Sequence, residues 1–162
     1  MTPLTPEKAL AKAAHLCAQG EKSPKEIFDK LITWGVSEPD AEEIVCRLRE
    51  EKYIDEERYA HAFVHDKFVY EHWGKVKISY ALRQKGISES LISNTLDDVI
   101  SDEDYVQSLS DLLASRMRGM SLPLSVNDRA KLYRFAMQRG YDSQTFSSAV
   151  RGVGESSDDL EY

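Results

Sequence analysis

The segment ISYALRQKGISESLISNTLDDV, residues 78–99, shows the pattern that decides the fold of this chain. Its apolar residues Ile78 and Leu82 precede Gly86, and Ile92, Leu96 and Val99 follow it. Spacings of three and four residues place side chains on one face of a helix, and a glycine between two such faces supplies the left-handed cap that ends a helix. The segment therefore predicts two amphipathic helices joined by a tight turn.

The same pattern occurs three times along the chain, centred on Gly35, Gly86 and Gly140. The corresponding apolar positions are Ile27, Leu31, Val36, Ala41, Val45 and Leu48 in the first copy; Ile78, Leu82, Ile87, Ile92, Leu96 and Val99 in the second; and Leu132, Ala136, Tyr141, Phe146, Val150 and Val153 in the third. Recurrence at a period of about fifty residues indicates tandem structural repeats.

The helix-start signals also favour an all-α chain. Thr5 and Ser23 each pair an N-cap hydroxyl with proline at the first helical position, and Ser23 forms a capping box with Glu26. Candidate caps near later helix starts are Asp40, Ser88, Asp102, Asn127 and Asp142. No segment alternates apolar and polar residues as a strand would. We predict about nine helices in three tandem three-helix, helix-turn-helix-like repeats that form an elongated, curved array.

The predicted repeats span residues 5–54, 55–100 and 101–153, and an acidic tail, residues 154–162, is predicted to be disordered. The third repeat differs from the others because the segment Gly119–Leu124 lengthens the link between its first two helices. This segment is either a flexible loop or a point of contact with a partner.

Composition excludes several classes of protein. The net charge of -7 argues against indiscriminate coating of nucleic acid, and no apolar run approaches the length of a membrane span. The first residues, Met1–Leu10, lack the basic and apolar segments of a signal peptide, so we expect a cytoplasmic protein with no membrane association. Cys17 and Cys46 are too few for a disulfide framework, and we expect both to be small buried apolar residues.

Catalytic or metal-binding motifs are sparse. His61 and His65 lie four residues apart and would share a helical face, but no glutamate lies between them and no third ligand is specified. No phosphate-binding glycine loop, nucleophile elbow or paired cysteine and histidine is evident. We therefore predict no catalytic residues, no metal and no cofactor, and not an enzyme.

Charge is segregated along the chain. Residues 67–85 contain five basic residues and one acidic residue, and residues 116–139 contain six basic residues and one acidic residue. In the second repeat Lys77, Tyr80 and Gln84 recur at helical spacing, and in the third repeat Lys131, Arg134 and Gln138 occupy the same offsets. The first repeat has Glu26, Asp29 and Thr33 there.

A charged helix face is either simply solvated or a binding surface, and the recurrence in register favours a binding surface. The candidate residues for contacts with a partner or nucleic acid are Lys67, Lys75, Lys77, Tyr80, Arg83, Gln84, Lys85, Arg129, Lys131, Arg134, Gln138 and Arg139.

One stretch resembles a known family. Residues 53–60 read YIDEERYA, Trp73 and Gly74 follow, and residues 81–87 read ALRQKGI, which together resemble the central motif of the RecX family of recombinase regulators. Residues 23–27, SPKEI, resemble the opening repeat of that family. Lys75 stands where the family usually has proline, and Ala81 where an acidic residue is common.

The resemblance implies a monomeric regulator, not an enzyme, that binds the RecA nucleoprotein filament. Such a protein modulates ATP hydrolysis, strand exchange and co-protease activity, usually by inhibition, with effects on recombination, DNA repair and the SOS response. DNA contact would be weak or made through the filament. Two alternatives stay open: a helix-turn-helix DNA-binding protein, because each glycine turn joins two helices, and a generic helical scaffold for another protein.

Overall fold

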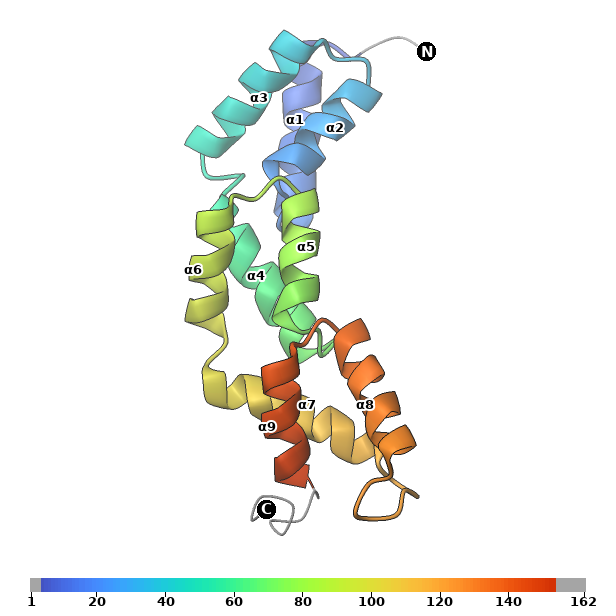
Figure 1. The fold of residues 1–162 in the computed structure, drawn as a ribbon. Helices are drawn as coiled ribbons and strands as arrows, with labels where there is room; N and C mark the ends of the chain where they lie inside the picture. The colour runs from blue at the N-terminus through green and yellow to red at the C-terminus, as the bar shows by residue number, and fades with distance from the viewer. Residues whose placement is uncertain (1–3, 154–162) are drawn as a thin grey trace. The chain divides into compact units, whose positions relative to one another are not determined.

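The computed structural model describes residues 4–153, and all of the regular secondary structure in that range is helical. The helices (Figure 1) are α1 Pro6–Gln19, α2 Pro24–Thr33, α3 Glu38–Glu50, α4 Glu56–Val69, α5 Lys75–Gln84, α6 Glu89–Val99, α7 Asp102–Arg116, α8 Val126–Gln138 and α9 Ser143–Val153. The predicted all-α fold is thus confirmed for this part of the chain. The predicted acidic tail, residues 154–162, lies outside the described residues.

The three repeat glycines occupy equivalent turns. Gly35, Gly86 and Gly140 follow α2, α5 and α8, and their φ angles are 87°, 80° and 95°. A positive φ at this point ends a helix at little steric cost only for glycine. The residue after each glycine donates its N–H to a carbonyl of the preceding helix, as Ile87 does to Leu82 over 3.1 Å.

Most predicted helix caps are present, with small shifts in position. Thr5 and Ser23 accept hydrogen bonds from the N–H groups three residues later, and Ser88 and Asp142 do the same. At three other starts a serine performs this role in place of the residue we expected nearby, because its hydroxyl lies one turn before the first free N–H groups. These caps are Ser37, Ser101 and Ser125, where Asp40, Asp102 and Asn127 lie inside the helices.

The contacts within the chain define two compact units, which we describe separately. Unit 1 comprises residues 4–63 and 81–95, and unit 2 comprises residues 64–80 and 96–153. Helices α4, α5 and α6 each contribute residues to both units. Side chains of the middle repeat therefore help to form both cores.

In unit 1, α1, α2 and α3 pack together (Figure 1). They enclose one apolar cluster. The buried members of this cluster are Ala9, Ala13, Ile27, Leu31, Val36, Ala41, Ile44, Val45, Leu48 and Ile54. These include all six positions of the first repeat pattern, so the predicted helix faces are confirmed here.

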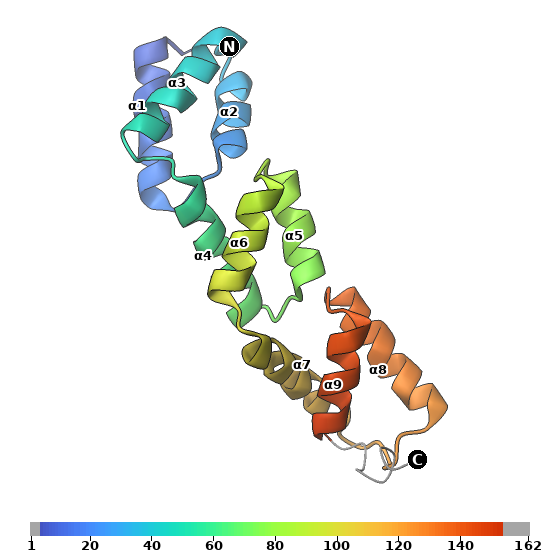
Figure 2. The ribbon, with the colours of Figure 1, turned by 60° about the vertical axis from the view of Figure 1, so that its left-hand side comes forward.

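In unit 2, α7 packs mainly against α9, and α8 contacts both (Figure 2). The buried apolar residues of these helices are Tyr105, Leu109, Leu113, Leu132, Ala136, Phe146, Ala149 and Val150. Residues 117–125 connect α7 to α8, in agreement with the longer link predicted for the third repeat.

The two cysteines differ from our expectation. Cys17 is half-buried, but Cys46 is exposed. Cys46 lies on the face of α3 opposite the buried Ala41 and Leu48, and its thiol lies 3.7 Å from a Glu50 oxygen. Among the described residues, no helix combines the length and the apolar composition needed to cross a bilayer.

Candidate partner-binding surfaces

The α8 basic stripe of unit 2 consists of Lys131, Arg134 and Gln138, and all three side chains are exposed. The opposite face of α8 carries Leu132 and Ala136, which are fully buried. Within residues 4–153, no ion pair engages Lys131 or Arg134. The helix is held by its apolar face, so the charged groups of the stripe are presented to solvent.

Beside this stripe lies an α8–α9 groove of about 460 Å³. Its lining residues are Val126, Arg129, Ala130, Tyr133, Arg134, Ser143, Phe146 and Ser147. The Tyr133 and Phe146 rings meet edge to face with centroids 5.3 Å apart, and Tyr133 shares a 2.7 Å hydrogen bond with Ser143. Phe146 is buried, whereas Val126 is 86% exposed. The groove thus combines apolar and aromatic side chains with two arginines of α8, Arg129 and Arg134.

Three other predicted basic residues of unit 2 place their ammonium groups over aromatic rings. The ammonium groups of Lys67 and Lys77 lie 4.7 and 4.4 Å from the centroid of Trp73, and Lys67 also pairs with Glu71. The Lys75 ammonium lies 4.6 Å from the centroid of Tyr105. Such contacts are attractive, so these lysines contribute to the internal packing of unit 2 as well as to its surface charge.

The two remaining predicted arginines of unit 2 also contact rings. The Arg129 guanidinium lies 5.5 Å from the Phe146 centroid, and that of Arg139 lies 5.3 Å from the Phe135 centroid. Arg139 also donates a 3.0 Å hydrogen bond to the carbonyl of Glu71. Tyr80, by contrast, is 63% exposed on α5.

In unit 1 the predicted residues are Arg83, Gln84 and Lys85. Arg83 pairs with Glu89 across the Gly86 turn, and this hydrogen bond lowers the pKa of the exposed Glu89 carboxyl. Lys85 lies 3.7 Å from a Glu26 oxygen, and Gln84 is exposed. The residues that we grouped by their positions in the sequence therefore have different surroundings in the structure. Lys131, Arg134 and Gln138 are the set that shares one exposed helix face.

Backbone contacts join two repeats in unit 2, and no pattern in the sequence predicts them. Gly74 donates its N–H to Arg139 O at 2.7 Å, and Val76 donates to Gly140 O at 3.0 Å. A Cβ on Gly74 would collide with the Gly140 carbonyl group. We call this set of contacts the unit 2 junction.

The aromatic side of the unit 2 junction is formed by Tyr105 and Tyr141, whose rings stack with centroids 4.9 Å apart. The Tyr105 hydroxyl accepts a 2.8 Å hydrogen bond from the N–H of Lys75, and Tyr141 shares one with Ser108 at 3.1 Å. Burial raises the pKa of both tyrosines.

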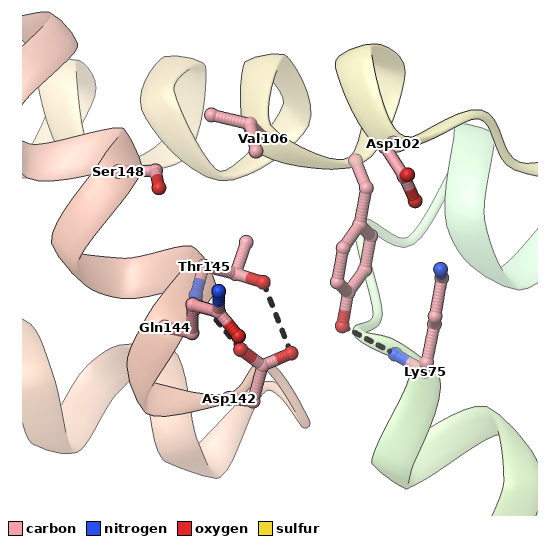
Figure 3. Close-up of a pocket in the computed structure, with 8 residues that line it drawn as sticks. Lys75, Asp102, Val106, Asp142, Gln144, Thr145 and Ser148 are labelled. Carbon is pink, nitrogen blue, oxygen red and sulfur yellow. Dashed lines mark hydrogen bonds between the residues drawn. The ribbon is translucent and has the colours of Figure 1, made fainter.

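A polar hollow of about 410 Å³ adjoins this junction (Figure 3). Lys75 and Asp102 lie on one side, and Asp142 and Thr145 face them from the start of α9. Both Asp142 oxygens are engaged by Thr145, at 2.7 Å from its N–H and 3.0 Å from its hydroxyl. The Asp142 carboxylate therefore caps α9, and the Thr145 hydroxyl takes part in this cap.

Unit 1 contains an equivalent junction, built from side chains. The Tyr59 hydroxyl donates to a Glu26 oxygen at 2.8 Å, and Arg58 donates to Glu21 at 2.6 Å. Tyr59 and Tyr105 each lie four residues after the cap of their helix, Asp55 or Ser101, and this common offset is the signal that could have identified them. We call these contacts the unit 1 junction.

These features define an all-helical repeat protein with exposed charged helix faces. A family model described as the second three-helix domain of RecX matches residues 55–96. The chain is 34% identical over 148 residues to the regulatory protein RecX of Chlorobium phaeobacteroides. The aligned region covers 89% of this chain and 92% of that protein. The chain belongs to the RecX family of regulatory proteins, which confirms the predicted resemblance.

Some relatives are longer than this chain. The chain is 30% identical over 138 residues to regulatory protein RecX of Clostridium tetani and spans only 62% of that protein's length. The crystal structure of RecX from Lactobacillus salivarius shares the fold, with a TM-score of 0.80 at 21% identity over 91% of this chain and 96% of that one. A second RecX crystal structure gives a TM-score of 0.77 at 24% identity, with 88% of this chain and 70% of that one covered.

Proposed function

We propose that this chain is a regulator that binds the RecA nucleoprotein filament and inhibits its ATPase, strand-exchange and co-protease activities. It acts through exposed helix surfaces, as a monomer in the cytoplasm, and without a cofactor. Membership of the RecX family supports the regulatory role. The observation that carries the proposed mode of binding is the α8 basic stripe, whose cations face solvent with no ion-pair partner within residues 4–153.

The charge of the stripe suits a partner surface that carries acidic side chains or phosphate. Complementary charge speeds encounter and fixes orientation, and a cation that is already exposed loses no internal contact when it binds. Of the other predicted contact residues, Tyr80 and Gln84 are also open to a partner. Those with internal contacts, such as Lys77 and Arg139, contribute mainly to local packing and charge.

The test is the ATPase activity of RecA on single-stranded DNA with added protein. The wild-type chain should slow hydrolysis, and the Lys131→Glu/Arg134→Glu variant should need roughly tenfold more protein for the same effect, equivalent to about 1.4 kcal/mol of binding free energy. The control variant Lys8→Glu/Lys30→Glu changes the net charge equally at two exposed positions of unit 1 and should behave like the wild type. Equal inhibition by both folded variants would exclude the stripe from the interface.

The runner-up function is direct DNA binding by a helix-turn-helix element. The observation that favours it is that basic α8 is joined to α9 by only residues 139–142. A titration of duplex DNA without RecA distinguishes the two, because direct binding requires tight association with a steep dependence on salt. We expect weak binding in this titration.

A further inference from the structure

The α8–α9 groove of unit 2 leaves apolar surface open to water. The two helices lie side by side (Figure 2), and the groove between them has a volume of about 460 Å³. Of its lining residues, Phe146 is buried, Tyr133 is 38% exposed and Val126 is 86% exposed. An apolar side chain packed against Val126 and Tyr133 would remove their surface from water, which is favourable. The groove therefore favours a ligand that carries an apolar side chain.

The charge of the groove favours a ligand that is also acidic. Arg129 and Arg134 are among its lining residues, and none of the described residues that line it is acidic. Within residues 4–153, no ion pair engages Arg134. A guanidinium group pairs with a carboxylate through two parallel hydrogen bonds. Carboxylates beside the apolar side chain would therefore match the arginines of the groove.

The length of the groove sets the size of the ligand. Arg134 lies eight residues after Val126 on α8, which is roughly 12 Å at 1.5 Å per residue. An extended chain covers that distance with about four residues. We propose that the groove is the docking site for an extended segment of a partner protein, in which an apolar side chain is flanked by carboxylates. The identity of this partner as the RecA filament rests on the proposed function.

A protein segment matches the groove better than a nucleic acid does. Phosphates would satisfy the arginines, but single-stranded nucleic acid binds proteins largely by stacking its bases on aromatic rings. Val126, the most exposed apolar residue of the groove, has no ring. The Tyr133 ring is held edge to face against Phe146, and its hydroxyl shares a hydrogen bond with Ser143. An aliphatic side chain is therefore the better complement to the exposed end of the groove.

The chemistry of the ligand can be tested without RecA. A phage library of short random peptides is selected for binding to the immobilised full chain. The recovered peptides should combine an aliphatic or aromatic side chain with carboxylates, because the groove offers both apolar surface and guanidinium groups. Recovery of basic or uncharged peptides alone, or of none above the background of the bare support, would overturn the proposal.

A pair of variants locates the bound peptide. Val126→Ser/Arg134→Gln changes two exposed side chains of the groove, so folding is not at risk, and the affinity for a selected peptide should fall roughly tenfold. The control Val76→Ser/Lys30→Gln makes the same kinds of change at exposed positions outside the groove and should bind like the wild type. Fluorescence anisotropy of the labelled peptide measures all three affinities. Equal affinities of the two variants would overturn the proposal.

The same assay tests the nucleic acid alternative. A labelled single-stranded oligonucleotide should bind the wild-type chain more weakly than the selected peptide does. If the oligonucleotide bound more tightly than the peptide, and Val126→Ser/Arg134→Gln removed that binding, the ligand of the groove would be nucleic acid and the proposal would be wrong.

The final measurement connects the groove to the proposed function. The ATPase activity of RecA on single-stranded DNA is slowed with the wild-type chain, and the selected peptide is then added in excess. The peptide should restore hydrolysis, and the same peptide with its carboxylates replaced by amides should not. Continued inhibition while the peptide occupies the groove would show that the filament does not dock there. A chain that never slowed hydrolysis would instead contradict the proposed function, and the peptide affinities would still report on the groove.

Discussion

The unit 1 and unit 2 junctions use equivalent positions in two different ways. In unit 1, a tyrosine hydroxyl and an arginine reach carboxylates, Glu26 and Glu21. In unit 2, the equivalent tyrosine, Tyr105, reaches a backbone N–H, and backbone groups of Gly74 and Gly140 meet directly. One repeat pattern thus supports a junction made by charged side chains and another made by main chain.

A single position explains much of this difference. Ser23 and Gly74 each lie twelve residues before the turn glycine that follows them. Ser23 has a side chain, and the Gly86 turn of unit 1 approaches no closer than an ordinary contact, 3.6 Å from a Cβ built on Gly86 to the Lys25 Cβ. Gly74 has none, and the Gly140 turn contacts its backbone. The comparison teaches that the absence of a side chain at one position determines whether two backbones can pair.

The strongest test of the comparison is alanine at the two turn glycines. Gly140→Ala adds a Cβ that meets Lys77 and also strains a φ of 95°, so we expect a loss of about 2–4 kcal/mol in the free energy of unfolding. Gly86→Ala strains a similar φ, but its Cβ meets Lys25 only at an ordinary contact distance of 3.6 Å, and its cost should be about 1 kcal/mol. Urea denaturation followed by circular dichroism measures both.

The control for this pair is Gly119→Ala, whose φ is 85° and whose added Cβ would contact nothing within 4 Å. It should cost as much as Gly86→Ala, because both substitutions introduce only backbone strain. If Gly86→Ala and Gly140→Ala destabilised the protein equally, close backbone approach would not distinguish the junctions.

Removal of the tyrosine hydroxyls should have the next largest effect. Tyr105→Phe leaves the N–H of Lys75 without its partner and should lower the free energy of unfolding by about 1–3 kcal/mol. Tyr59→Phe leaves a Glu26 carboxylate that still contacts Lys85, so its cost should be smaller, about 0.5–1.5 kcal/mol. In a Lys75→Pro background, the N–H is already absent, so Tyr105→Phe should cost less. Additive costs in that double-variant cycle would contradict the hydrogen bond.

Alkaline pH should weaken both junctions. Burial raises the pKa of Tyr59 and of Tyr105 above the ordinary value of 10.0, so above pH 10 the unfolded chain loses these protons first. Stability should then fall, by at most about 1.4 kcal/mol per pH unit for each tyrosine. Between pH 8 and 11, the difference in the free energy of unfolding between wild type and Tyr105→Phe should decrease. The free energy of unfolding of Tyr80→Phe, a change at an exposed site, should follow that of the wild type. Parallel curves for wild type and Tyr105→Phe would refute this.

The smallest expected effect is the salt dependence of the unit 1 junction. Lys85 and Glu26 are partly exposed and 3.7 Å apart, so Lys85→Met should cost less than about 1 kcal/mol at low salt. That cost should vanish near 1 M salt, because exposed charges are then screened. The cost of Tyr105→Phe should not change with salt. A salt-independent cost for Lys85→Met would indicate packing by its methylene groups instead.

The repeat pattern was sufficient to predict the helices and their buried faces. Leu31, Leu82 and Leu132 are fully buried as their spacing implies, and the three glycines all have positive φ. These properties depend on neighbours within a few residues, which a sequence displays directly.

The surroundings of the charged residues could not be predicted in the same way. Lys77 and Lys131 occupy the same offset in their repeats, but Lys77 lies over Trp73 and Lys131 is exposed. This difference arises because Trp73 lies four residues before Lys77, whereas Asn127, which is not aromatic, lies four residues before Lys131. Contacts made across tens of residues, such as Arg139 with Glu71, leave no periodic trace in the sequence.

The glycine at position 74 also constrains protein engineering. A chimaera in which the Ser23–Gly35 segment replaced its counterpart Gly74–Gly86 would retain every helix signal and every apolar position. It would nevertheless place a hydroxymethyl group where the third repeat brings its main chain. The repeats of this chain are therefore alike in pattern but not interchangeable. In such a chimaera, the serine at position 74 would have to be changed back to glycine before the Gly140 turn could pack against it.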